Sequence, residues 1–574
     1  MANSDNQENG EPKEGVREFT ACRVSRRQFL TLTAAGTTGA VLLELGNTMP
    51  GYAMREALAA TGESGTQTIV AGWASGPNGL DPEFHYTLRS IGVYRNSSAY
   101  PAHFAPKLVG QVYDRDFSRI RPKEAKEWKI NNDWTAVTIT LKEGVRSPTG
   151  NELTADDATW KFQRNWGLKG TTWGFLRDAL LMDGPEQITK ESKYVFTVHS
   201  KSPNALLQNI LAHWNWFFQD SVEYKKHASA DDRWAAKWAG SNYAGHGAWM
   251  ITEYTPGESW TYERNPNYYT QEFYTGNVRK VINKVIPSST NRVALLEAGS
   301  IDFAFDLQAS ELQKLQKTPG VRVDRLPGNK VQYLGFNFAV ASPLKDVNVR
   351  KAIGYALPYD ELIQRPYLGM AQRMTTTVAP SYAGYDITKG VFNDPTDIAR
   401  AKRFMAQSGY SKGFKTTLHY DIGMIGQEET AIIVKSALAQ IGIDVEIVKV
   451  QTGDFFNLAF GGQGFPGMFI YQDMCGAHDV NFGTHLWLKK DHCCSPGKYS
   501  NAEIDKLYVQ AQGTPGNFQK RAQLQREMDN IAFNVDPMGV PMQVLGFNQA
   551  ARQNVGGWTW YTLNEVIWDG AWKK

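Results

Sequence analysis

Cysteine is scarce in this sequence, and neither sign of charge dominates it. The 574 residues include 4 cysteines, and 61 basic side chains stand against 58 acidic ones, for a net charge of +3. Without a basic excess there is no electrostatic reason to expect nucleic acid or an anionic membrane surface as a partner. The length is sufficient for two or three packed domains.

Long hydrophobic runs are missing as well. The apolar stretch at residues 29–43 is too short to span a bilayer, which takes about 20 residues. It follows Ser25-Arg26-Arg27-Gln28-Phe29-Leu30, which resembles a twin-arginine (Tat) export signal, and it precedes a small-residue site at residues 57–59. We therefore expect residues 1–59 to be a Tat-type signal peptide. An amphipathic N-terminal helix is the alternative.

The next cysteine after the apolar stretch is Cys475, so there is no lipobox. We expect a mature protein that is periplasmic or otherwise extracytoplasmic and is not a lipoprotein. In an oxidising compartment Cys475 could pair with Cys493 or Cys494, closing a loop of about 18 residues. A soft metal site is the alternative, because three histidines lie nearby in the sequence: His478, His485 and His492.

The motifs of several enzyme classes are absent. The sequence has no G-x-S-x-G nucleophile elbow, no H-E-x-x-H zinc motif and no G-x-x-x-x-G-K-[ST] phosphate loop. We expect no enzyme activity, no catalytic residues and no cofactor.

The mature region alternates strand-like and helix-like segments. Residues 136–141 are rich in β-branched side chains and predict a strand, and Thr154 is a good N-cap for the helix that follows. Residues 428–441 have apolar side chains at helical spacing, Gly442 ends that helix, and residues 443–448 alternate as a strand. The repetition favours an α/β fold.

A series of short segments resembles one known family. The chain is similar to the bacterial extracellular solute-binding proteins of family 5, the peptide, nickel and opine class. His246 stands where the family pattern has Thr. The segments are Leu80-Asp81-Pro82, residues 128–130, 141–145, 153–157, Gly245-His246-Gly247-Ala248-Trp249, and residues 264–269, 298–302, 333–337, 349–357 and 437–445.

This resemblance implies a periplasmic-binding-protein fold, with two α/β lobes that close around a ligand. Two crossing strands join the lobes, and the hinge is expected near residues 327–337 and 536–544. An inserted subdomain belongs to lobe I. The implied boundaries are 65–110, 243–327 and 540–574 for lobe I, 111–242 for the inserted subdomain and 328–539 for lobe II.

The resemblance also points to candidate ligand-binding residues. In peptide binders of the family an aspartate pairs with the α-ammonium of the peptide; spacing places Asp473 at that position, with Asp479 as the competitor and Tyr471 beside them. The alternative for either aspartate is a helix or turn cap. The remaining candidates are Trp249 as an aromatic platform or a core residue, Arg373 as a carboxylate partner or a surface residue, and Asn337 at the hinge or as a strand end that satisfies backbone groups.

The expected function is that of the substrate-binding component of an ABC importer. It would capture an oligopeptide or related small solute and deliver it to the membrane permease subunits, acting as a monomer. An oligosaccharide, an opine or a metal chelate is the alternative ligand, and the 17 Trp and 25 Tyr would suit sugar stacking.

Overall fold

The computed structural model describes residues 67–574, except residues 86, 214, 269–275, 341, 461–463, 475–478, 489–494 and 562–564. The predicted signal peptide at residues 1–59 therefore lies outside the described residues. In the part of the chain that is described, no helix has the length and hydrophobicity needed to cross a membrane.

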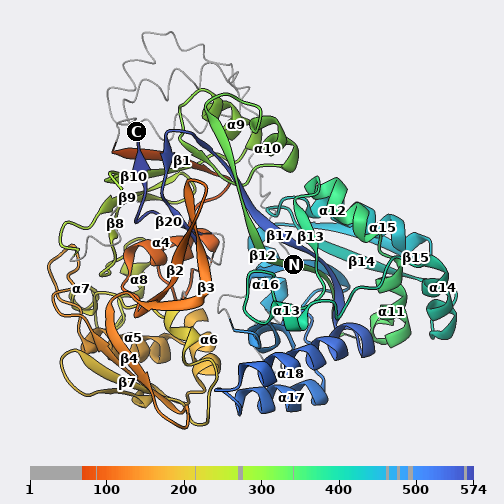
Figure 1. Ribbon diagram of the computed structural model, residues 1–574, viewed down its shortest axis with the longest axis horizontal. Helices are drawn as coiled ribbons and strands as arrows, with labels where there is room; N and C mark the ends of the chain where they lie inside the picture. The colour runs from red at the N-terminus through yellow and green to blue at the C-terminus, as the bar shows by residue number, and fades with distance from the viewer. Residues whose placement is uncertain are drawn as a thin grey trace, which may run out of the picture. The chain divides into compact units, whose positions relative to one another are not determined.

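One mixed sheet of eleven strands, counted over the described residues, runs through both lobes (Figure 1). Its order is β15-β14-β16-β12-β17-β11-β1-β10-β9-β8, with β13 also pairing with β17. The strands are β1 (Thr68–Trp73), β8 (Trp249–Thr255), β9 (Ser259–Arg264), β10 (Lys280–Val285), β11 (Phe303–Ala304), β12 (Val321–Phe336), β13 (Ala371–Arg373), β14 (Phe414–Asp421), β15 (Ile443–Val450), β16 (Met468–Met474) and β17 (Gly539–Arg552).

Two long antiparallel strands, β12 and β17, connect the lobes, as the resemblance implied. Each also pairs with a strand of one lobe. The end of β17 pairs with β11 on the lobe I side, and the second half of β12 pairs with β16 on the lobe II side. The register between β12 and β17 shifts between Leu326 and Lys330. Pro327 lies in this gap and has no N–H to give to the ladder, so the irregularity falls at the start of the predicted hinge.

In its described residues lobe I carries the helices α4 (Leu88–Ser97), α9 (Ser289–Glu297) and α10 (Ala309–Leu315). The inserted region contributes two four-stranded sheets, one of which is completed by strands from the C-terminal segment. Its elements are β2 (Ala102–Val109), β3 (Val112–Pro122), β4 (Ala125–Ile130), β5 (Ala136–Leu141), α5 (Ala155–Leu168), α6 (Thr171–Leu180), β6 (Ile188–Lys190), β7 (Val195–His199), α7 (Ser221–Lys226) and α8 (Ala236–Ala239), with β19 (Thr559–Tyr561) and β20 (Glu565–Ile567) added to β2 and β3; the short pair β18 (Val555–Gly556) and β21 (Trp572–Lys573) lies near the C-terminus.

Lobe II carries the remaining helices around β14, β15 and β16. They are α11 (Val347–Ala356), α12 (Tyr359–Tyr367), α13 (Tyr385–Thr388), α14 (Ile398–Gln407), α15 (Gln427–Ala439), α16 (Thr452–Phe460), α17 (Ala502–Gln512) and α18 (Phe518–Asn530).

Local sequence signals account for several of these elements. Thr154 caps α5 in a capping box with Asp157, whose carboxylate accepts from the Thr154 backbone N–H at 2.8 Å. β5 alternates buried and half-buried residues, as a strand with one face in the core does. Helix α15 ends just before Gly442, which has a φ of +82° that disfavours other residues. The predicted strands, helix and cap are confirmed.

A buried ion pair fastens the inserted region to the start of lobe I. The Arg164 guanidinium of α5 donates to Asp81 through two hydrogen bonds of 2.9 and 2.6 Å. The two side chains are 1% and 0% exposed. A bidentate arginine–carboxylate pair in such surroundings is strongly directional, so Asp81 of the Leu-Asp-Pro segment has a structural role.

Candidate functional site

Asp473 lies on β16 in lobe II. This strand is the direct neighbour of the crossing strand β12, and Asp473 pairs with Val331 of β12. Its carboxylate is half-buried and accepts hydrogen bonds from Trp487 Nε1 at 3.0 Å and from the Tyr471 hydroxyl at 3.2 Å. The rings of Tyr471 and Trp487 both approach Tyr333 of β12, at 5.5 and 6.1 Å between centroids. Asp473 is therefore an anion held in a defined orientation by an aromatic wall close to the hinge.

Asp479 is buried in a polar network of lobe II. It forms an ion pair with Arg521 of α18 and accepts from the Asn481 backbone N–H at 3.0 Å. Its second oxygen accepts from Asn209 Nδ2 of the inserted region at 3.0 Å. These contacts agree with a turn-capping aspartate that also joins two parts of the chain, the alternative weighed for it.

Aromatic side chains make a second contact between the inserted region and lobe II. Phe175 of α6 stacks on His213, with ring centroids 4.3 Å apart. Both rings lie against Phe482, 5.8 Å away in each case. His485, one of the histidines weighed as a metal ligand, stacks on Phe482 and has its Nδ1 2.8 Å from the Tyr508 hydroxyl. Together with Asn209–Asp479, this contact holds the two regions together.

On the lobe I side of the hinge, Arg89 and Asp306 form an ion pair at 3.3 Å. The Arg89 guanidinium also lies 4.2 Å over the ring of Trp73. Burial lowers the pKa of Lys330, on β12, to about 8, with Asp306 opposing the shift and Arg89 adding to it. Lys330 pairs with Met474, one position along from the Val331–Asp473 pair, so its side chain and that of Asp473 belong to opposite faces of the sheet.

A buried glutamate lies behind this group. Glu565 of β20 is 1% exposed, and neither carboxylate oxygen has a hydrogen-bond partner among the described residues. Burial raises its pKa to about 8 against the pull of Arg95, Arg89 and Arg115. Glu565 borders a cavity of about 10 Å³, which has room for about one water molecule. The charge of this carboxylate is therefore costly in the absence of a partner.

The Glu565→Gln substitution should change how stability depends on pH. The raised pKa means that the native state keeps a proton which the unfolded state loses above pH 4.5. Protonated Glu565 therefore adds its full contribution to the unfolding free energy below pH 4.5. As the pH rises from 4.5 to about 8, this contribution falls by up to about 1.4 kcal/mol per pH unit. The variant, which does not titrate, should become the more stable protein as pH rises through this window. Urea unfolding of both proteins between pH 4.5 and 9 measures the difference; parallel curves would contradict it.

The other candidates from the sequence lie away from Asp473. Trp249 is buried at the β8 edge of the sheet, with the Arg264 guanidinium 4.2 Å over its ring. Arg373 stacks 3.3 Å over Tyr359 within lobe II. Asn337 donates to the Phe465 carbonyl and accepts from the Ala339 N–H. These placements favour core packing for Trp249 and backbone satisfaction for Asn337, so Asp473 and Tyr471 remain as the ligand-binding proposal.

Three residues of the groups described above could not be found from the sequence pattern. Trp487 contacts Asp473 from a separate segment of lobe II, and Arg89 and Glu565 line one cavity of lobe I; none of the three occurs in a recognised motif. The predicted disulfide partners Cys475, Cys493 and Cys494 lie outside the described residues, and their pairing stays a prediction.

The two α/β lobes, the crossing strands and the inserted subdomain define a periplasmic-binding-protein fold. The family model of the bacterial extracellular solute-binding proteins, family 5 Middle, matches residues 119–486, and the chain belongs to this family.

Comparisons with individual proteins agree. The chain is 26% identical over 490 residues to heme-binding protein A of Haemophilus influenzae, covering 79% of this chain and 87% of that protein. It is 26% identical over 466 residues to the probable D,D-dipeptide-binding periplasmic protein DdpA of Escherichia coli, covering 80% and 85%. The structure of the periplasmic binding protein DppA of Helicobacter pylori with the peptide STSA has a TM-score of 0.76 at 20% identity, covering 88% of this chain and 98% of that one.

Proposed function

We propose that this protein is the extracytoplasmic substrate-binding component of an ABC importer and captures an oligopeptide or a related small solute between its lobes. The observation that carries the proposal is the placement of Asp473. A half-buried carboxylate, oriented by Trp487 and Tyr471 beside the crossing strands, suits the α-ammonium of a peptide. The relatives that bind dipeptides and a peptide, by their names, support this choice.

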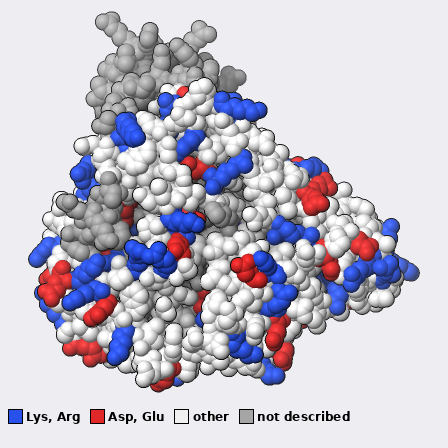
Figure 2. Space-filling model, in the orientation of Figure 1, with Lys and Arg blue, Asp and Glu red and all other residues white. Residues whose placement is uncertain are grey.

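We also propose that it delivers the ligand to membrane permease subunits and has no catalytic function; membership of a family of extracellular solute-binding proteins supports both proposals. We further propose export by the Tat route from the twin arginine Arg26-Arg27, release as a protein without a lipid anchor, and action as a monomer. Figure 2 shows basic and acidic side chains interspersed on the face in view, which is in keeping with a net charge of +3.

A metal chelate is the second candidate ligand, and a specific observation favours it. The relative from Haemophilus influenzae is named for heme binding and matches this chain over a similar length to the dipeptide-binding relative.

A thermal-shift screen tests the function. The purified mature protein should melt at a higher temperature with the right ligand, because binding to the folded state adds RT ln(1 + [L]/Kd), about 2.7 kcal/mol at a hundredfold excess over Kd. The panel contains di- to pentapeptides, hemin, opines and oligosaccharides. We expect stabilisation by a peptide. Stabilisation by hemin alone would select the second candidate, and an unchanged melting temperature with every ligand would contradict the solute-binding proposal.

A further inference from the structure

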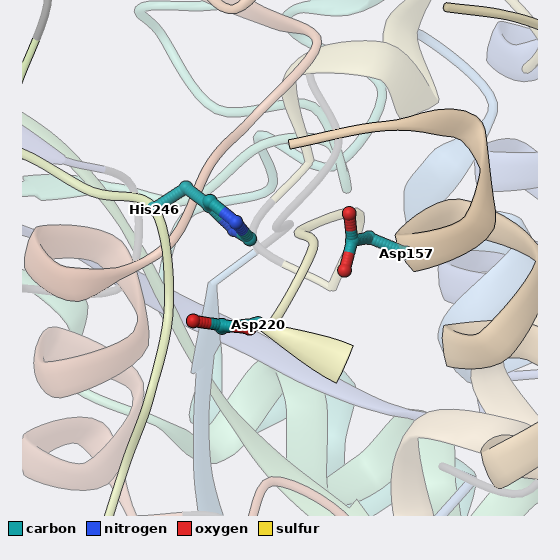
Figure 3. Close-up of side chains that lie close together, drawn as sticks. All are labelled: Asp157, Asp220 and His246. Carbon is teal, nitrogen blue, oxygen red and sulfur yellow. The ribbon is translucent and has the colours of Figure 1, made fainter. Parts of the chain in front are cut away.

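A cluster of three buried side chains lies apart from the hinge, where the inserted region meets lobe I. Asp157 of α5, Asp220 just before α7 and His246 just before β8 are 2%, 0% and 0% exposed. One potential ligand atom from each lies within 4.8 Å of the other two. Figure 3 shows the His246 imidazole directed into the space between the two carboxylates, which come from separate segments.

Backbone contacts fix the segments that carry these side chains. Gln219 and Gly245 form an antiparallel bridge, and the Asp220 N–H donates to the Ala244 carbonyl at 3.1 Å. Gly247 packs against the end of α4 so closely that a Cβ atom there would lie 2.4 Å from the Ser97 carbonyl carbon. His246 therefore has little freedom to turn away from the carboxylates.

The polar atoms of His246 have no partner among the residues that the structure describes. Neither ring nitrogen forms a hydrogen bond with any described residue, although the side chain is fully buried. A buried imidazole normally has at least one nitrogen bonded, because an unmet bond costs about 1–3 kcal/mol.

In the described part of the chain, neither carboxylate forms an ion pair with a lysine or arginine. The buried basic side chains of α5, Lys161 and Arg164, pair with Glu83 and Asp81 instead. Asp157 accepts from the backbone N–H groups of Thr154 and Ser221. Asp220 accepts from the Glu223 N–H, from Thr149 and from Asn151, all neutral donors. Two buried carboxylates thus face an imidazole that has no hydrogen-bond partner among the described residues, an arrangement that suits a bound cation.

We propose that Asp157, Asp220 and His246 bind a divalent transition-metal ion of the zinc class as a buried structural site. One imidazole nitrogen and two carboxylate oxygens suit Zn²⁺, with water as a fourth ligand, whereas an imidazole ligand disfavours Mg²⁺ and Ca²⁺. Bonds of about 2.0–2.1 Å place ligand atoms about 3.3–3.5 Å apart, so binding would draw the three groups together slightly. Thr149, Asn151 and Glu223 would orient the Asp220 carboxylate as outer partners. The ion would tie the inserted subdomain to lobe I.

The test is the metal content of the full mature protein, produced without a polyhistidine tag and refolded with Zn²⁺, Mn²⁺ or Ca²⁺ before dialysis. We expect one equivalent of Zn²⁺ in the natural protein and at least a tenfold lower content in His246→Gln. His227→Gln is the matched control: it changes an exposed histidine of the same region and should retain the ion. Absence of bound Zn²⁺ in the natural protein, or equal content in His246→Gln, would overturn the proposal.

X-ray absorption of the zinc-loaded natural protein tests the site without any variant. We expect one imidazole and otherwise oxygen ligands. Sulfur ligands would place the ion at Cys475, Cys493 or Cys494 and would overturn the assignment to His246. Because neither measurement involves a solute, failure here leaves the proposed transport function standing.

Discussion

Replacing Asp81 with alanine should lower the unfolding free energy by about 3–5 kcal/mol, the range for removing one partner of a buried ion pair. The loss arises because the Arg164 guanidinium, 1% exposed, would keep its charge without the two hydrogen bonds to Asp81. Arg164 retains one bond to the Trp234 carbonyl at 3.1 Å, which does not balance the charge. Urea unfolding followed by tryptophan fluorescence measures the change.

An exposed ion pair that also involves α5 provides the control. Asp156 of α5 and Lys190 of β6 lie 2.8 Å apart, but the side chains of Lys190 and Asp156 are 40% and 58% exposed. Lys190→Ala should therefore cost no more than about 1 kcal/mol. The double variant Asp81→Ala with Arg164→Met should recover most of the stability lost in the single variant, because it removes the stranded charge. A single Asp81→Ala loss equal to that of Lys190→Ala would show that the buried pair does not hold the two regions together.

Local signals in the sequence were sufficient to predict individual helices and strands, because each signal acts over a few residues. Thr154 caps α5 through Asp157, three positions later, and Gly442 ends α15 through its own backbone conformation. The ordered motifs supplied the family and hence the crossing strands. The same reasoning identified Asp81 as part of a motif but not its role, since Arg164 is 83 positions away.

The candidate site was predictable only in part. Asp473 was proposed from its spacing in the family resemblance, but its partner Trp487 lies beyond a turn whose path no spacing rule gives. Trp249 shows the reverse case: an aromatic residue in a family motif suggests a ligand platform, while the fold places it in the core under Arg264. His246 stands where the family pattern has Thr. Its proposed role as a metal ligand depends on Asp157 and Asp220, which the tertiary structure brings close to it.

Replacing Asp473 with asparagine should weaken binding of a peptide with a free α-ammonium by about 2–5 kcal/mol, or roughly 30- to 5000-fold in Kd. This prediction rests on the proposed function. Asparagine preserves the size of the side chain and an oxygen that accepts from Trp487 Nε1, so the change isolates the negative charge. Isothermal titration with the best peptide from the screen measures the effect, and the ligand-free melting temperature of the variant should stay close to that of the natural protein.

A chemical cycle locates the ammonium. N-acetylation of the same peptide removes the positive charge that Asp473 is proposed to bind, so acetylation should weaken binding to the natural protein as much as the substitution does. Acetylation should then have little further effect on Asp473→Asn, because both changes remove one interaction. If acetylation weakens binding to the two proteins equally, the ammonium is bound by another group. Asp306, beside Arg89 and near Lys330 on the lobe I side of the hinge, is then the next residue to replace, since its carboxylate is only 21% exposed.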